Sequence, residues 1–181
     1  MMKNTRQMAL DALLIALCAV LGYISLDLGF IKVTFESLPV LLSGLLFGPM
    51  DGFIVGALGT LIYQVLRYGV TATTILWMVP YMVCGGVVGF YAKSHNFRLS
   101  RKQIMFIVIV TELLITVLNT GVIFVDSKIY GYYSVAYVFG SLALRLATCV
   151  VKSIAFGVVL PGIVKAVRHS LHLWKETGEA S

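Results

Sequence analysis

Charged side chains in the most apolar part of the chain are the first candidates for chemistry. Glu112 and Arg145 each lie near the middle of a long apolar segment. A charge at the centre of a membrane-spanning helix costs about 2.5–3.5 kcal/mol on insertion scales, so it normally faces a partner or water. We therefore predict a buried Glu112–Arg145 ion pair. Such a pair either orients two helices without touching a ligand or leaves arginine donors free for an anionic ligand.

A third buried charge, Lys152, follows Arg145 by seven residues, which is about two helical turns, on roughly the same face. The long apolar stem of a lysine lets its ammonium group reach a distant polar region. Lys152 is therefore expected either to extend toward the cytoplasmic side or to meet a partner subunit.

Polar and aromatic side chains of a second group lie toward the outer ends of the apolar segments. Aromatic residues at that depth are typical of the interfacial belt of a membrane protein. The accompanying glutamine, asparagine and threonine side chains find no partners in lipid, so they favour a half-apolar pocket that is open to the outside. The predicted binding residues are Tyr23, Phe35, Glu36, Gln64, Arg67, Thr73, Trp77, Tyr81, Asn119, Tyr133 and Arg145.

Enzyme signatures are missing from this sequence. It contains no HExxH, no GxSxG, no phosphate-binding loop and no pair of aspartates placed for intramembrane proteolysis. The three cysteines lie within apolar segments and lack a CxxC or Cys/His spacing, which argues against disulfides and metal binding. We expect no enzymatic activity, no metal and no cofactor.

The composition of the chain indicates that these segments lie in a lipid bilayer. Of 181 residues, 59% are hydrophobic and 12% are charged, whereas a soluble domain carries about 25% charged residues. The sequence therefore predicts an all-α membrane protein, with one domain of six transmembrane helices over residues 1–181. A chain of this length has no room for a nucleotide-binding domain, so any energy source must come from another protein.

The six helices are predicted over residues 8–26, 37–47, 50–66, 75–92, 103–125 and 134–167. The second is too short to cross a hydrocarbon core of about 30 Å, so it should tilt or pack inside the bundle. The segment 27–36 alternates between apolar and polar residues, which is typical of an extended or hairpin-like loop. Gly52 and Gly56 form a GxxxG pattern, which allows two helices to approach closely.

The basic residues give the predicted orientation. The net charge of +6 is concentrated between apolar runs, which favours membrane orientation over nucleic-acid binding. With the N-terminus inside, nine basic residues fall on the cytoplasmic side and three in the outer loops. This bias places both termini in the cytoplasm. The apolar N-terminal stretch is long enough to span and has no convincing cleavage site, so it is expected to remain as the first helix.

Three runs of residues carry a resemblance to a known family. Helix 1 contains ALDALLIALCAVLGY, with Ala12 and Ala16 on a small-residue ridge. The next loop and helix read KVTFESLPVLLSGLLFGP, and the third helix has the form GxxxGxxGTL. Together they resemble the substrate-binding S components of energy-coupling factor (ECF) vitamin transporters. The specific motifs lie in roughly the first third of the chain, while length and topology agree over nearly all of it.

This resemblance implies a subunit in a prokaryotic cell membrane that captures a water-soluble vitamin from outside. It also implies docking of Ala12 and Ala16 onto a transmembrane coupling subunit attached to two ATPases. The substrate stays open between folate, pantothenate and riboflavin, because Tyr23 and the run 70–77 differ from the residues of folate-binding members. The alternatives are a stand-alone carrier or channel for a small solute and a structural membrane subunit without a ligand.

Overall fold

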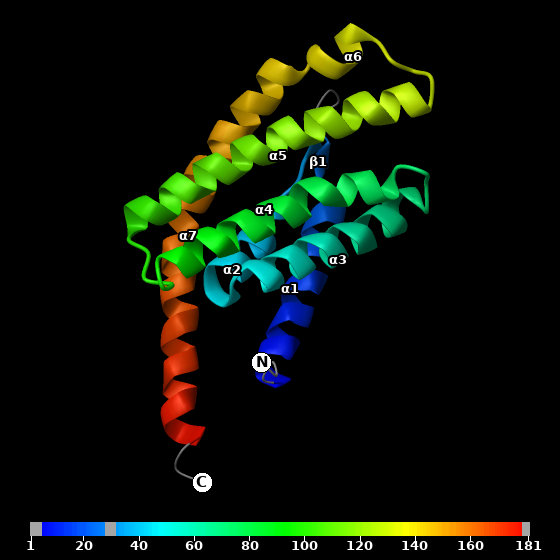
Figure 1. Ribbon diagram of the computed structural model, residues 1–181. Helices are drawn as coiled ribbons and strands as arrows, with labels where there is room; N and C mark the ends of the chain where they lie inside the picture. Colours follow the sequence, from blue (N-terminus) through cyan, green and yellow to red (C-terminus); the bar gives the residue numbers. More distant parts are fainter. Residues whose placement is uncertain (1–4, 28–31, 179–181) are drawn as a thin grey trace.

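Helices account for nearly all of the computed structural model, which describes residues 5–27 and 32–178 (Figure 1). The prediction of an all-α bundle is confirmed. The long helices are α1 (Thr5–Tyr23), α3 (Pro49–Tyr68), α4 (Thr74–Ser94), α5 (Arg101–Ile129) and α7 (Leu142–Gly178), and the short ones are α2 (Ser37–Phe47) and α6 (Val135–Phe139). Two short strands, β1 (Leu26–Asp27) and β2 (Lys32–Val33), form an antiparallel pair in the segment expected to be extended or hairpin-like.

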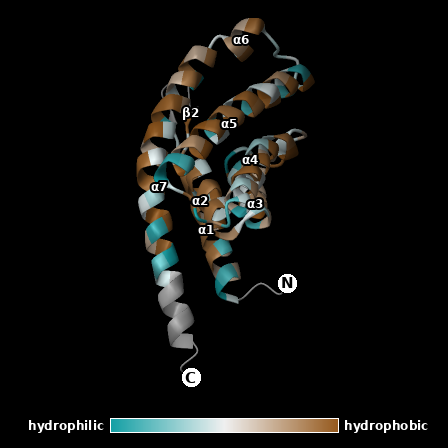
Figure 2. Cartoon of the chain, turned by 60° about the vertical axis from the view of Figure 1, so that its left-hand side comes forward, coloured by the Kyte–Doolittle hydropathy of each residue, from teal (hydrophilic) through white to brown (hydrophobic). Residues whose placement is uncertain are grey.

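Five helices of the described chain are long and apolar enough to cross a membrane: α1, α3, α4, α5, and a fifth stretch over Val135–Ser170. Large hydrophobic side chains point outward from them, and Leu66, Phe90 and Val158 are each about two-thirds exposed or more. Figure 2 shows that hydrophobic residues make up most of the length of these helices. Outward apolar surface of this extent is suited to lipid, so the chain is a multi-pass membrane protein.

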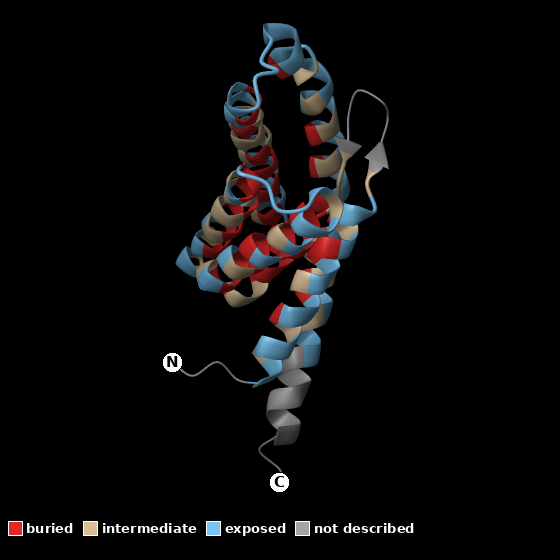
Figure 3. Cartoon of the chain, turned by 90° about the vertical axis from the view of Figure 1, so that its right-hand side faces the viewer, coloured by how far each residue is buried: buried red, intermediate tan, exposed pale blue. Residues whose placement is uncertain are grey.

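The short helix α2 packs inside the bundle, as expected from its length. Its eleven residues would span only about 16 Å. Leu41 and Leu45 on this helix are almost completely buried, and they share a core with Val88 of α4 and Leu160 of α7. Figure 3 shows the buried residues concentrated where these helices meet. Helix α2 therefore acts as a central support of the bundle.

Glycines hold α3 and α4 in close contact. A Cβ atom on Gly85 would lie 2.0 Å from the carbonyl oxygen of Gly52, and a Cβ on Gly56 would lie 2.5 Å from the carbonyl oxygen of Tyr81. Neither position can take a larger residue without moving the backbone of the neighbouring helix. The GxxxG pattern of α3 thus performs the role that its spacing predicts.

The last predicted helix, over 134–167, is divided in the structure. The short α6 ends at Phe139, and α7 begins at Leu142 and continues through Pro161. Ser134 caps α6 by accepting a hydrogen bond from the Tyr137 amide at 3.0 Å. The cap thus starts α6 where the prediction placed the helix start, whereas the division falls at Gly140 and Ser141, which hydropathy does not reveal because both helices are apolar.

The connections between helices fall at two ends of the bundle. The loops after α3 and α5 lie at one end, and the connections α2–α3 and α4–α5 lie at the other (Figure 1). The start of α1 and the end of α7 lie away from the loops after α3 and α5 (Figure 1). The end formed by these two loops is the one predicted to face the outside.

Candidate functional site

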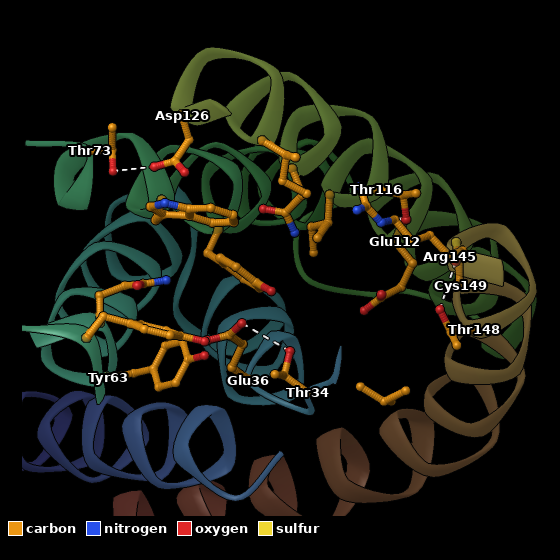
Figure 4. A pocket seen from close by; sticks show the side chains of 18 of the residues that line it. Thr34, Glu36, Tyr63, Thr73, Glu112, Thr116, Asp126, Arg145, Thr148 and Cys149 are labelled. Carbon is orange, nitrogen blue, oxygen red and sulfur yellow. Dashed lines mark hydrogen bonds between the residues drawn. The ribbon is translucent and has the colours of Figure 1, made fainter. Parts of the chain in front are cut away.

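A cavity of about 510 Å³ occupies the part of the bundle next to the loops after α3 and α5. Side chains from α3, α4, α5, α6 and α7 line it, together with the segment between β2 and α2. Seven of the predicted binding residues belong to its lining: Glu36, Gln64, Thr73, Trp77, Tyr81, Asn119 and Arg145. Figure 4 shows three polar groups around the space: Thr34, Glu36 and Tyr63 on one side, Thr73 and Asp126 on another, and Glu112, Thr116, Arg145 and Thr148 on a third.

The first polar group is built around Glu36, which is 3% exposed. Thr34 Oγ1 donates a hydrogen bond to Glu36 Oε1 at 3.1 Å. A Cβ on Gly22 would lie 2.8 Å from both Glu36 Oε2 and the Tyr63 ring. The absence of a side chain at Gly22 therefore makes room for the carboxylate and the ring beside α1.

The second polar group ties the two loops of this end together. Thr73, in the loop after α3, donates a hydrogen bond from Oγ1 to Asp126 Oδ1 at 2.5 Å. Tyr132, in the loop after α5, donates its hydroxyl to the other oxygen of Asp126. Burial, and then the bond to Asp126, raise the pKa of the Tyr132 phenol above its usual value. Asp126 thus joins segments that are far apart in the sequence.

The third polar group corrects the ion pair expected from the sequence. Glu112 Oε2 lies 2.9 Å from Nζ of Lys152. Among the described residues, no ion pair joins Glu112 to Arg145. Helices α5 and α7 pack side by side with opposite chain directions, and Lys152 lies two turns farther along α7 than Arg145. The register between the two helices therefore brings Lys152, and not Arg145, to the depth of Glu112.

Arg145 remains on the cavity wall without that partner. Its Nη1 atom is buried and has no hydrogen-bond partner among the residues that the structure describes. Its carbonyl oxygen accepts a hydrogen bond from Thr148 Oγ1 at 2.8 Å, which belongs to the wall of α7 itself. Tyr137 of α6 also lines the cavity.

Four predicted binding residues lie outside the cavity lining. Tyr23 is 55% exposed at the end of α1. Arg67 donates from Nη1 to the Tyr23 carbonyl oxygen at 2.9 Å and to Ser25 Oγ at 2.7 Å. These contacts fasten the end of α3 to the segment after α1, which is a structural role.

Aromatic packing holds the other two of these four residues. The Phe35 ring packs edge-on against Phe156 at a centroid distance of 6.4 Å. The Tyr133 ring packs edge-on against Phe124 at 5.4 Å, outside the cavity lining. A tyrosine or phenylalanine near an interface is more often part of the packing than of a ligand site.

Several cavity residues were not among the predicted binding residues, although they share helical faces with Asn119 and Arg145, which were. On α5, Glu112, Thr116, Asn119 and Asp126 recur at helical spacing and all line the cavity. On α7, Arg145, Thr148 and Lys152 do the same. A polar stripe of helical period within an apolar helix marks the face that turns away from lipid. The remaining hydroxyl-bearing side chains of the lining outside the predicted set are Thr34, Tyr63, Tyr68, Thr71, Tyr130 and Tyr137.

The two proposed docking residues lie elsewhere, on the outer face of α1. Both Ala12 and Ala16 are exposed, next to the exposed side chains of Leu13 and Leu17. Within the described part of the chain, no group of three or more His, Cys, Asp or Glu side chains is arranged to hold a metal ion.

Comparison with known proteins adds a family to this geometry. The family model "ECF transporter, substrate-specific component" matches residues 6–171. The chain belongs to this family. The matched range includes every residue that lines the cavity, so the cavity lies within the part of the chain that the family shares.

Solved structures have the same fold as this substrate-specific component. One, described as the structure and mechanism of the S component of a bacterial ECF transporter, has a TM-score of 0.67 and 21% identity, and the match covers 91% of this chain and 99% of the other. A second, FolT bound with folic acid, has a TM-score of 0.64 and 22% identity over 84% of this chain and 90% of the other. No curated protein matches the chain in sequence.

Proposed function

We propose that this substrate-specific component captures a water-soluble vitamin of the B-vitamin class from outside the cell and passes it to an ATP-driven importer. The observation that carries the proposal is the cavity of about 510 Å³ with aromatic and polar walls, within a chain of this family. Ligand sites of small molecules commonly measure about 300–1,000 Å³ and combine apolar walls with a few placed polar groups. The volume is suited to a vitamin-sized ligand.

The composition of the walls supports a ligand with a ring and several hydrogen-bonding groups. Trp77, Tyr81 and Tyr63 supply ring surfaces to the cavity, and the two tyrosines add hydroxyl groups. Gln64 and Asn119 add amides that both donate and accept. Folic acid is bound by FolT, and folate, pantothenate and riboflavin are the candidates for this chain.

Energy for uptake would come from a transmembrane coupling subunit and two ATPases. The S component would bind without catalysing a reaction, in a prokaryotic cell membrane, with both termini in the cytoplasm and the cavity toward the outside. The exposed ridge of Ala12 and Ala16 on α1 would be the docking face for the coupling subunit, because small side chains let helices of two proteins approach closely.

Identification of the bound molecule tests this function. The protein would be purified in detergent, small molecules released by denaturation would be identified by mass spectrometry, and melting would be followed across a panel of water-soluble vitamins. We expect one vitamin to co-purify and to raise the melting temperature. A protein that carries none and responds to none would instead be a structural subunit.

Transport assays separate the S component from a stand-alone carrier. In proteoliposomes, the protein alone should bind the vitamin without accumulating it inside. Accumulation should require the coupling subunit, the ATPases and ATP. Uptake by the protein alone would identify a carrier or channel.

A further inference from the structure

The cavity wall formed by α5 and α7 carries polar side chains at two depths. The inner layer is the Glu112–Lys152 pair, with 2.9 Å between Oε2 and Nζ. Because the chain directions of α5 and α7 are opposite, moving seven residues outward on each helix leads to Asn119 on α5 and Arg145 on α7. Seven residues correspond to about 10.5 Å along a helix axis. Asn119 and Arg145 therefore form an outer layer at a shared depth, two turns from the ion pair.

The two layers differ in how their polar atoms are satisfied. In the inner layer, the charges of Glu112 and Lys152 compensate each other. In the outer layer, Arg145 Nη1 and Asn119 Oδ1 are buried and have no hydrogen-bond partner among the described residues. Both residues line the cavity. Unpaired buried polar groups are costly, so such a pair in a cavity wall indicates a ligand that completes them.

The acidic side chains of the cavity are already engaged elsewhere. Glu36 accepts a hydrogen bond from Thr34, and Asp126 accepts from Thr73 and Tyr132. Among the described residues that line the cavity, Arg145 is thus a cation without a carboxylate partner. A guanidinium group stays charged at any pH that a protein tolerates and keeps its donors in a planar fork.

We propose that Arg145 and Asn119 form an anion subsite that takes a carboxylate group of the transported vitamin. The inference rests on the proposed function and narrows it to the carboxylate-bearing class of water-soluble vitamins. The planar fork of Arg145 matches the two oxygens of a carboxylate. Because Asn119 Oδ1 is itself an acceptor, the amide must turn over so that its NH₂ group donates to the same anion.

The charge balance of the cavity favours a carboxylate over a phosphate. The lining holds three acidic side chains, Glu36, Glu112 and Asp126, and two basic ones, Arg145 and Lys152. These five side chains already sum to a formal charge of −1, so Arg145, with Lys152 engaged by Glu112, can pair with one further negative charge at most. A carboxylate brings one such charge, whereas a phosphate monoester brings nearly two at neutral pH.

Matched pairs of ligands test whether the protein prefers carboxylate-bearing vitamins. Binding to the purified full-length protein would be measured by titration calorimetry for pantothenate against panthenol, nicotinate against nicotinamide, biotin against its amide, and riboflavin against riboflavin 5′-phosphate, with folate as a further carboxylate. We expect a carboxylate to bind most tightly and its neutral analogue to bind about 30-fold more weakly or worse. Tightest binding of a neutral vitamin or of the phosphate would overturn the inference.

Variants of the outer layer locate the subsite. Arg145→Gln should weaken binding of the best carboxylate by about 30-fold or more, whereas the matched charge removal Arg101→Gln, at the exposed start of α5, should leave it unchanged. Asn119→Asp would place the missing carboxylate in the protein itself. We expect this variant to have a higher melting temperature without ligand and to lose carboxylate binding. If Arg145 had only a structural role, carboxylate binding would not be lost.

These experiments distinguish failure of the anion subsite from failure of the proposed vitamin-binding function. If a vitamin binds but Arg145→Gln and Asn119→Asp leave its affinity unchanged, the anion subsite is wrong and the binding function stands. If no compound of the panel binds to the unmodified protein, both the proposed function and the subsite are wrong.

Discussion

Glu112 is 2% exposed, and its side chain carries a charge in the middle of a membrane-spanning helix. A charge in that position persists only with a compensating partner, and Lys152 at 2.9 Å supplies it. The pair also keeps Lys152 from acting as a second cation for a ligand. Ion pairs such as this one determine which charges in the cavity remain available to a ligand.

Removing the lysine should therefore destabilise the protein. Lys152→Met leaves a buried carboxylate without compensation, for which we expect a loss of about 3–5 kcal/mol in the free energy of unfolding. The double variant Glu112→Gln/Lys152→Met should recover most of that loss. Thermal melting in detergent measures both.

A double-mutant cycle between Glu112 and Arg145 serves as the control. Because Glu112 and Arg145 form no ion pair in the described structure, the effects of Glu112→Gln and Arg145→Gln should add. Strong coupling between these two substitutions would show that the pair predicted from the sequence exists in solution.

Thr73 provides a second prediction at this scale. Its hydroxyl, in a side chain 1% exposed, donates to Asp126. Thr73→Val removes that donor, and the buried carboxylate should cost about 1–3 kcal/mol of stability. In the control Thr120→Val, the lost hydroxyl bonds, among the described residues, to the carbonyl oxygen of Thr116 on its own helix. The melting temperature of this control should change far less. Equal losses would remove Asp126 as the reason.

At the scale of elements, the contact between α3 and α4 positions two walls of the cavity. Tyr63 and Gln64 on α3 and Trp77 and Tyr81 on α4 all line it. The helices approach so closely that a Cβ on Gly85 would overlap the backbone of Gly52. Their spacing is therefore a condition for the shape of the site.

Adjacent glycines allow a sharp test of that contact. Gly85→Ala should force the two helices apart and cost about 1–3 kcal/mol or more. Gly86→Ala adds the same methyl group where nothing lies within 4 Å, so it should be neutral or slightly stabilising through its helix propensity. Melting followed by circular dichroism distinguishes them, and equal behaviour would contradict the close packing.

At the scale of the whole molecule, the cavity and the exposed face of α1 are separate surfaces, since no residue of α1 lines the cavity in the described chain. Ligand binding and partner docking should therefore be separable by mutation. A site enclosed by α3, α4, α5, α6 and α7 can remain intact while α1 changes on its outer side.

The docking prediction uses this separation. Ala12→Trp or Ala16→Trp should abolish energised uptake while leaving the affinity for the vitamin unchanged, because a large side chain blocks close helix contact. Val158→Trp, on the 70% exposed outer side of α7, is the matched control and should retain uptake. Uptake that survives both alanine substitutions would move the docking face away from α1.

Orientation is the other prediction at this scale. Ala72 lies in the loop after α3 and Arg98 in the loop after α4, and both are exposed. In a variant free of native cysteines, an impermeant maleimide should label Ala72→Cys in intact cells and label Arg98→Cys only after the cells are opened. The reverse pattern would place the cavity toward the cytoplasm.

The sequence alone was enough to predict the membrane class, the helical bundle, the short internal helix and the family. Each of these depends on composition, on runs of apolar residues, or on local motifs such as the leucine-rich run before Gly48-Pro49. Such properties belong to a segment and are nearly independent of how its neighbours pack.

The partners of the polar side chains were decided by tertiary structure. Lys152 meets Glu112 because of the register between α5 and α7, and Arg67 fastens Tyr23 instead of facing the cavity. Asp126 joins two loops that are close only after the helices have packed. Depth along each helix can be counted from the sequence, but the rotation and register that bring two helices together depend on all of their packed side chains.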